Sequence, residues 1–426
     1  MAHIFPYFLP ILCLVIREDI PMNYTQVGIL SMTGILVTIP FTIVFGFLGD
    51  RIAHLRLELI AGGFLLVFGH TFIIAFAQSY AILILAAVIC GIGASIFHPI
   101  ALPLLSQEFG ADRNVAHSFN LIFGTLGSVV TPISSIALSG WLGWRSTSLI
   151  FGIFGAIFFP ILFILLLKGK KHLNYTLHTN RQLKPKEKQE STRQEEKKGL
   201  QAFPFLTLPF IALVLAQILR SGIFRVINTF TSFIFEDRFG ASELVSAGIT
   251  SAVLGLGGVS ALISGFFSRK RGSLFTFILS MVGTSIASVF ILVFIGVIDM
   301  NKVTITIPLL IVAIIFFAFA TIGFYFGSPS SNALLAEMLP PEVLSSVYGI
   351  INALMTGFSS TIPVIFGAIV DQKFSFPYEY LILIVLSVVP LLLLLYLKSQ
   401  IGLKTPDQIE EERMFAIPAY ENIMKK

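Results

Sequence analysis

The sequence predicts an all-α integral membrane protein with twelve transmembrane helices, arranged as two six-helix pseudo-repeats. Three observations lead to this prediction: an apolar composition, a series of apolar stretches, and a long charged segment that divides them six and six. Of the 426 residues, 55% are hydrophobic and 12% are charged, and the mean hydropathy is +0.89. A soluble domain of this length cannot bury so much apolar surface, whereas a membrane protein exposes it to lipid.

Each apolar stretch is a candidate span, because about 20 apolar residues cross the hydrocarbon core as a helix. The first stretch is short and contains Pro6 and Pro10. We expect that the true start lies upstream, and an incomplete, kinked first helix is the alternative. The expected spans are residues 2–16, 26–48, 57–78, 80–105, 115–140, 146–167, 204–234, 244–267, 273–298, 303–327, 343–370 and 379–397.

The highly charged segment 168–202 marks the boundary between the halves. Its composition predicts a solvated linker, and a regulatory or lipid-headgroup role is the alternative. The expected domains are a six-helix bundle over 1–167, the linker over 168–202, a second bundle over 203–398 and a tail over 399–426. Lys and Arg gather in the linker, the tail and every second loop. This pattern predicts cytoplasmic termini in a plasma (inner) membrane protein.

Charge and cysteine usage exclude several classes of function. The net charge of +5 comes from basic loops between apolar stretches, so we expect no nucleic-acid partner. Cys13 and Cys90 both lie in hydrophobic stretches, which argues against a disulfide framework or a metal site. We expect no cofactor, no metal and no enzymatic activity, because no constellation of catalytic side chains is evident. The expected surroundings are a lipid bilayer, and the expected state is a monomer.

The polar turn between the second and third stretches contains Gly46, Gly49, Asp50, Arg51 and Arg56. Glycines at such a position let two helices approach closely. An aspartate there can face the N-terminus of a neighbouring helix, where the dipole favours an anion. This turn resembles the loop between helices 2 and 3 of the major facilitator superfamily of transporters. The resemblance implies the two-bundle fold of that family and a role for Gly46, Asp50 and Arg51 in conformational gating.

A degenerate second copy of the turn supports a duplication. Gly265 and Arg269 occupy, in the second half, the places of Gly46 and Asp50. Phe97-His98-Pro99 and the polar starts of the second and sixth stretches resemble the fosmidomycin-resistance branch, whose members export drugs and small anions. Ala87 stands where many drug–proton antiporters of the superfamily carry arginine. This departure argues against proton-coupled drug export.

Two arginines lie within the seventh stretch, where a charge is costly and marks a functional site by default. At about 100° per residue, Arg220, Arg225, Gln217 and Asn228 share one arc of the helix with Ser221. That arc must face protein or water. No acid lies in the interior of an expected span, because the acids sit at helix ends, such as Glu58 and Asp371. We therefore expect these four residues to bind an anionic substrate, with Arg220 as its main partner. Bonding of both arginines to carbonyls, helix C-termini or lipid phosphate is the alternative.

His98 completes the expected site, because an imidazole in the fourth stretch can bind substrate or carry a coupling proton. A packing role beside Pro99 is equally compatible with the sequence. The sequence thus predicts a secondary active transporter of a small solute, anionic or drug-like, that works by alternating access. A passive uniporter or a non-transporting receptor of the same fold is the alternative.

Overall fold

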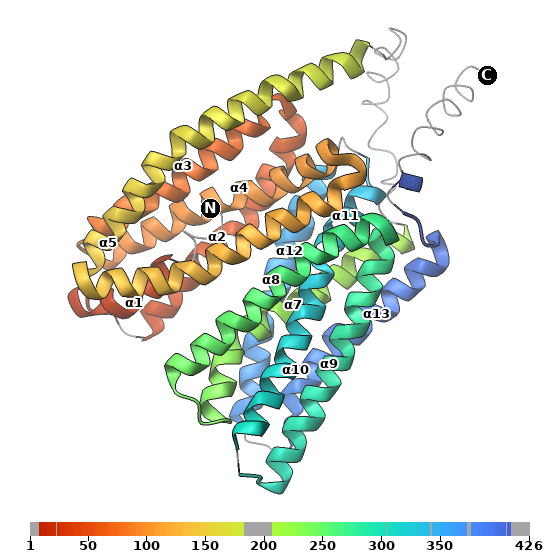
Figure 1. Ribbon diagram of the computed structural model, residues 1–426. Coiled ribbons are helices and arrows are strands. Elements are labelled where there is room, and N and C mark those ends of the chain that lie inside the picture. The colour runs from red at the N-terminus through yellow and green to blue at the C-terminus, as the bar shows by residue number, and fades with distance from the viewer. Residues whose placement is uncertain are drawn as a thin grey trace.

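The computed structural model describes residues 8–22, 24–182, 207–304, 306–340, 343–372, 376–405 and 407–409, and these residues are almost entirely helical (Figure 1). The N-terminal half consists of α1 (Phe8–Asp19), α2 (Tyr24–Arg51), α3 (Arg56–Ala75), α4 (Tyr80–Phe109) and α5 (Arg113–Gln182). The C-terminal half consists of α7 (Leu208–Asp237), α8 (Glu243–Arg271), α9 (Ser273–Asn301), α10 (Ile307–Phe326), α11 (Ser328–Met338), α12 (Leu344–Asp371) and α13 (Leu381–Ile401).

The helices form two sets of six, as the sequence predicts. The 70 residues of α5 comprise two spans, because the backbone turns at Gly143, whose φ of 77° is left-handed. In the other half, α10 and α11 are two parts of one apolar span, Ile307–Met338, broken at Gly327. With these two assignments, each half contributes six helices. The predicted fold is therefore confirmed for the described part of the chain.

Element boundaries differ from the expected ones at three places. Within the described residues, α1 has 12 residues, too few to cross a bilayer alone; residues 1–7, which bear on the expected upstream start, lie outside the described residues. The helix α5 continues through Gln182, into the segment expected to be a linker, and residues 183–206 lie outside the described part. The last helix ends at Ile401 and so takes in the first three residues of the expected tail; of the rest of that tail, residues 402–405 and 407–409 are described.

Each half packs around its own apolar core and presents apolar side chains outward. In the C-terminal half the core includes Phe235, Phe317 and Phe366, and in the N-terminal half it includes Phe68 and Ile100. Many leucine, isoleucine, valine and phenylalanine side chains on the outer faces are exposed. Ten stretches of the described helices are long and apolar enough to cross a membrane, so the chain is a multi-pass membrane protein.

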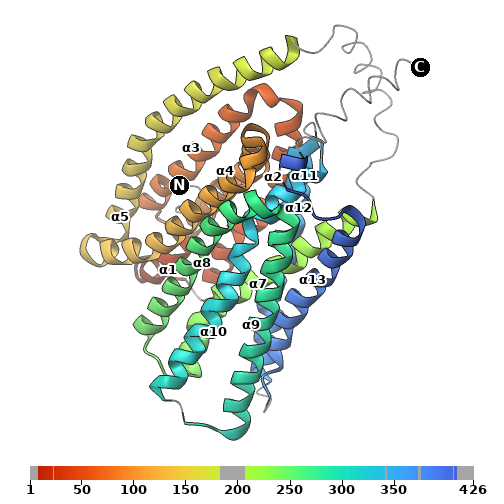
Figure 2. The same cartoon turned by 45° about the vertical axis from the view of Figure 1, so that its right-hand side comes forward.

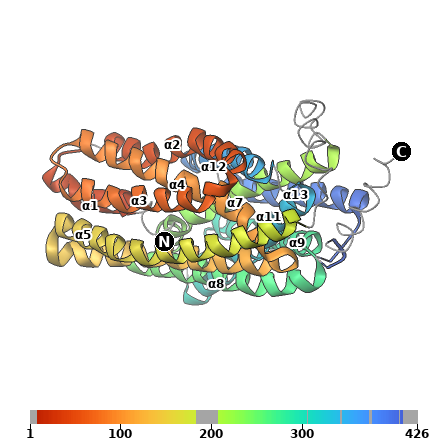
Figure 3. The ribbon, with the colours of Figure 1, turned by 90° about the horizontal axis from the view of Figure 1, so that it is seen from above.

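The two halves meet mainly along two helix pairs, α2 with α12 and α5 with α8, and α4 with α12 and α5 with α11 make further contacts. Figure 3 shows one pair at either edge of the molecule. The halves converge near the turn between α2 and α3, and their ribbons diverge away from it in both side views (Figures 1 and 2). We call the converging region the α2–α3 end. The glycine-mediated contacts between the halves lie toward this end, which positions the candidate gate.

Candidate functional site

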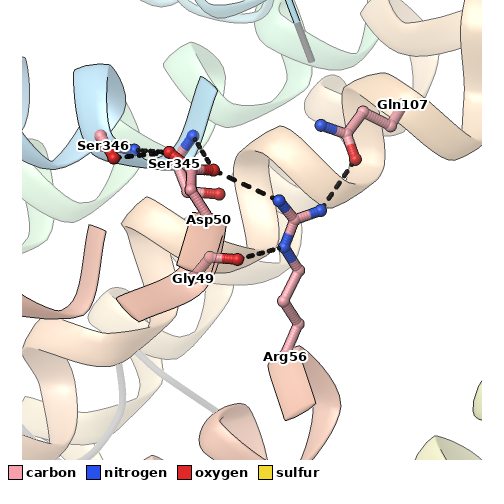
Figure 4. A network of polar contacts seen from close by, with 6 residues as sticks. All are labelled: Gly49, Asp50, Arg56, Gln107, Ser345 and Ser346. Carbon is pink, nitrogen blue, oxygen red and sulfur yellow. Dashed lines mark hydrogen bonds and ion pairs between the residues drawn. The ribbon is translucent and has the colours of Figure 1, made fainter. Parts of the chain in front are cut away.

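The carboxylate of Asp50, in the last turn of α2, caps the first turn of α12 in the opposite half (Figure 4). Its Oδ1 accepts a hydrogen bond of 3.0 Å from the Ser345 backbone N–H. Its Oδ2 accepts hydrogen bonds of 2.6 Å from both the backbone N–H and the hydroxyl of Ser346. The first N–H groups of a helix have no partner within it, and the helix dipole favours an anion there. The predicted meeting of Asp50 with a neighbouring helix N-terminus is thus present.

Arg56, at the start of α3, holds Asp50 in this position. Its guanidinium lies 3.3 Å from Asp50 Oδ1, and it donates hydrogen bonds to the Gly49 carbonyl at 2.7 Å and to Gln107 Oε1 at 2.9 Å (Figure 4). Arg56 is only 7% exposed. Arg51, which the sequence analysis assigned to gating, is exposed. The geometry therefore favours Arg56 over Arg51 as the basic partner of Asp50.

Gly46 lies where α2 and α12 touch. A Cβ at Gly46 would lie 2.7 Å from the Ser345 carbonyl oxygen, and one at Gly349 would lie 2.7 Å from the Thr42 carbonyl oxygen. Real Cβ atoms essentially never approach backbone atoms so closely, so both positions require glycine in this arrangement. The close approach expected from Gly46 is present, and it brings Asp50 within reach of the α12 N-terminus.

The second copy of the turn makes the corresponding contact between α8 and α5. A Cβ at Gly265 would overlap the side chain of Ser118 and would lie 2.9 Å from the Asn114 carbonyl oxygen. Arg269, which takes the place of Asp50, pairs instead with Asp112 at 2.7 Å. Asp112 lies immediately before α5. The charges are thus reversed: in this copy the cation belongs to the glycine-bearing helix and the acid to the loop before the partner helix.

Arg220 lies inside the C-terminal bundle. It is 4% exposed, and its Nη2 donates hydrogen bonds to the Phe324 carbonyl at 2.5 Å and to Ser328 Oγ at 2.6 Å. Its guanidinium lies 4.0 Å from the ring centroid of Phe324 and 5.4 Å from that of Phe277. Arg220 Nε has no hydrogen-bond partner among the described residues. The side chain therefore joins α7 to the carboxyl end of α10, at the break before α11.

The other polar residues of α7 divide between two neighbouring helices. Gln217 is buried, and its Nε2 donates a 3.2 Å hydrogen bond to the Ser331 carbonyl on α11. Arg225 is half-buried, and its Nε donates a long hydrogen bond of 3.4 Å to Ser359 Oγ on α12. Asn228 is half-buried on the same helix. Arg225 is thus more accessible and less tightly held than Arg220.

His98 lies on α4 in the opposite half and is half-buried. Its ring packs edge-on against Phe97, with 5.5 Å between the centroids. The helix that carries it contacts α11 and α12. Among the described residues, no group of three or more His, Cys, Asp or Glu side chains is placed to hold a metal ion.

A partly buried ionic cluster in the C-terminal half was not predicted from the sequence. Arg238, after α7, pairs with Asp299 at the end of α9 and, at 2.5 Å, with Glu379 before α13. Glu379 is 3% exposed. A guanidinium near the end of α7 and acids at the ends of two other apolar stretches are visible in the sequence. Only the topology reveals that all three stretches end at the same corner.

Comparisons with known proteins agree with this architecture. Residues 4–363 match the family model of the Major Facilitator Superfamily. The solved structure of the proton:xylose symporter XylE, a major facilitator superfamily protein bound to 6-bromo-6-deoxy-D-glucose, superposes with a TM-score of 0.70 at 14% sequence identity, and the match covers 96% of each chain. This likeness shows the fold.

A curated relative is similar over a shorter stretch. The "Probable nitrate transporter NarT" of Staphylococcus carnosus (strain TM300) is 25% identical over 150 residues, which are 35% of this chain and 38% of the relative. The match therefore spans well under half of the relative's length. The family model, in contrast, covers most of the chain, and the two six-helix halves have the corresponding architecture. The chain belongs to the Major Facilitator Superfamily.

Proposed function

We propose that the protein carries a small anionic solute across the membrane by alternating access, with the cationic side of its site on α7. One observation carries the proposal: α7 bears two guanidinium groups, Arg220 and Arg225, whose hydrogen-bond partners are neutral. These partners are Phe324 O and Ser328 Oγ for Arg220, and Ser359 Oγ for Arg225. Neither arginine belongs to an ion pair between described residues. An uncompensated charge at this depth is costly, and a bound anion offsets that cost.

The two arginines have different parts in this proposal. Arg225 is the contact residue, because it is half-buried and holds Ser359 only at 3.4 Å. Arg220 is covered by aromatic rings, so its part is indirect. It adds positive electrostatic potential near Arg225 and holds α7 against the break between α10 and α11. Gln217 and Asn228 complete the polar surface of α7, and His98 is the candidate for solute or proton binding on the opposite half.

The limited likeness to a relative named as a nitrate transporter supports an anion over a neutral solute. The Phe97-His98-Pro99 sequence supports a place in the fosmidomycin-resistance branch, and export is the direction that this branch suggests. The positive charges of the linker and tail support a cytoplasmic α2–α3 end. In that orientation the closed gate faces the cytoplasm, and the halves diverge toward the outside.

The test is solute counterflow in proteoliposomes with nitrate and small organic anions. It is measured with equal pH on both sides of the membrane and with an imposed pH gradient. We expect anion-dependent counterflow, and we expect Arg225→Gln to weaken the apparent affinity for the anion at least about tenfold, which corresponds to the loss of roughly 1.4 kcal/mol of binding free energy. Arg220→Leu should abolish transport while the protein remains folded in the membrane. Ser359→Ala is the matched control, since it removes the neutral partner of Arg225 and keeps the cation.

Normal counterflow by both arginine variants would contradict the anion site. Anion binding without counterflow in the unaltered protein would instead identify a receptor of the same fold. Dependence of the rate on the imposed pH gradient would assign a coupling proton, and loss of that dependence in His98→Gln would place the proton at His98.

A further inference from the structure

The segment after α13 folds back over the α2–α3 end. Gly402 has a left-handed backbone with φ of 70°, which turns the chain out of the helix. The chain then passes the turn between α8 and α9, where a Cβ at Gly272 would overlap the carbonyl group of Lys404. We call residues 402–405 and 407–409 the strap. Its backbone is thus seated directly on the second-half copy of the gating turn.

The strap begins a short helix with its own capping contacts. Thr405 N–H donates to Gln408 Oε1 at 2.8 Å, and Gln408 N–H donates to Thr405 Oγ1 at 3.4 Å. This reciprocal pair is a capping box, which fixes the start of a helix. Asp407 therefore lies in a first helical turn, where an acid is favourable. The local sequence specifies how Asp407 is presented.

Arg269 connects the strap to both halves of the molecule. Its Nε lies 2.7 Å from Asp112 Oδ1 in the N-terminal half, and its Nη1 lies 2.6 Å from Asp407 Oδ2 in the strap. The two acids use different nitrogen atoms, so they bind the guanidinium together and do not compete for one position. A guanidinium held at two points keeps a fixed orientation. Asp407 therefore orients Arg269 toward Asp112.

The seat of the strap is incompletely filled. A cavity of about 200 Å³ lies between the strap residue Ile409 and the bundle residues Leu274, Leu334, Met338 and Ile401. Glu337 and Lys404 also line this cavity, and a cavity of this size admits water, so protein atoms cover its apolar side chains only in part. The ionic contacts of Arg269 are also partly exposed, with 65% of Asp112 and 66% of Asp407 accessible. The two ion pairs of Arg269 are thus individually weak, which is compatible with a releasable element.

We propose that the strap is a latch that stabilises the state closed at the α2–α3 end, because it orients Arg269 toward Asp112 across the two halves. The inference rests on the proposed alternating-access cycle. Release of the strap frees Arg269 and lowers the barrier to opening at this end. The C-terminal segment thereby regulates how often the gate opens, without any contact with the solute.

The test uses distances between spin labels on the full chain, with no solute present, so that it does not depend on which solute is carried. The labels replace His54 in the N-terminal half and Lys398 in the C-terminal half, which are both exposed, in a background without Cys13 and Cys90. We expect Asp407→Asn to raise the ratio of open to closed molecules roughly two- to fivefold, in line with an exposed charge pair. Deletion of residues 403–426 should raise it at least as much.

Two matched controls accompany these variants. Glu108→Gln removes another exposed acid at the same end, and deletion of residues 410–426 keeps the strap; both should leave the distances unchanged. Unchanged distances in Asp407→Asn and in the longer deletion would overturn the proposal, as would an equal shift in Glu108→Gln. The two proposals can fail separately. If the strap variants shift the label distances but the unaltered protein transports no anion, the latch is supported and the proposed solute is rejected.

Discussion

The carboxylate of Asp50 accepts two hydrogen bonds of 2.6 Å from one residue of the opposite half, the backbone N–H and the hydroxyl of Ser346. The backbone bond exists only while α12 begins beside the end of α2. If the halves separate at this end, the Asp50 carboxylate and the polar groups of Ser346 lose these hydrogen bonds, and each then binds water instead. We therefore expect the interaction of the Asp50 charge with the α12 N-terminus to favour the closed state.

Replacement of Asp50 by asparagine should open the gate more often. The amide keeps one hydrogen-bond acceptor but loses the charge, whose interaction with a helix N-terminus is worth about 0.3–2 kcal/mol. The ratio of open to closed molecules should rise by roughly two- to thirtyfold, measured from the distance between labels at positions 54 and 398. Ser346→Ala retains the backbone N–H and should have a smaller effect. A larger effect of Ser346→Ala than of Asp50→Asn would refute the role of the charge.

Close contact between α2 and α12 gives a second, charge-independent prediction. A Cβ at Gly349 would lie 2.7 Å from Thr42 O and 3.2 Å from Gly46 Cα. Gly349→Ala should therefore disfavour the closed state, because overpacking costs about 1–3 kcal/mol. Longer label distances and slower counterflow are the expected results.

Gly62→Ala on α3 is the control, since a Cβ at that position meets no atom within 4 Å. This variant should leave the distances unchanged and raise thermal stability slightly, because alanine is favoured over glycine inside helices. If Gly349→Ala also leaves the distances unchanged, the contact between α2 and α12 does not control the gate.

Salt and pH should affect the strap differently. The hydrogen bond from Arg269 holds the pKa of Asp407 below its usual value. The contact therefore contributes fully above the unfolded-state pKa of about 3.9 and is lost only as the pH falls through the lowered value. Between pH 5 and 8 the strap should stay attached. Higher salt should detach it, because the Debye length falls from about 10 Å at 0.1 M to about 3 Å at 1 M.

The measurement is the label distance distribution at each pH and salt concentration, with the 403–426 deletion as the reference. Salt should shift the distribution of the full chain toward that of the deletion, and pH should not. A transition between pH 5 and 8 that disappears in Asp407→Asn would contradict this assignment.

The sequence predicted those contacts of the candidate gate that depend on local pattern. Two glycines before Asp50 specify a helix end that a neighbour can approach, and the duplicated pattern at Gly265 specifies where the second contact lies. The sequence did not separate Arg51 from Arg56, because both follow Asp50 within six positions. Their difference arises at the turn Ala53–Leu55, which directs Arg56 back onto the Gly49 carbonyl.

The surroundings of the polar residues on α7 were predictable only in part. Helical periodicity places Arg220, Gln217 and Arg225 on one arc, but it does not say which neighbour covers each side of that arc. The structure covers Arg220 and Gln217 with α10 and α11 and leaves Arg225 against α12. The acceptor at Phe324 is a backbone carbonyl at a helix end, and the sequence gives no side-chain signal for such a partner.

Arg238 leads to the last prediction, which concerns stability. It neutralises Glu379, whose side chain is 4% exposed, and Asp299, whose side chain is 26% exposed. Arg238→Met leaves the Glu379 carboxylate buried without its cation, which costs about 3–5 kcal/mol in fully buried pairs and somewhat less at this partly exposed corner. The apparent Tm in detergent should fall clearly. Glu379→Gln added to Arg238→Met should restore much of the loss, because a neutral amide needs no cation.

Arg145→Met provides the matched control on the N-terminal half. Arg145 pairs with Asp19 at 2.6 Å, but their side chains are 44% and 51% exposed, and exposed pairs contribute about 0–1 kcal/mol. The apparent Tm of the Arg145→Met variant should change little. Equal Tm losses in Arg145→Met and Arg238→Met, or no recovery in the double variant, would mean that burial of Glu379 does not govern the stability of this corner. The predicted recovery instead identifies Arg238 as the residue that allows three helices of the C-terminal half to end beside one buried acid.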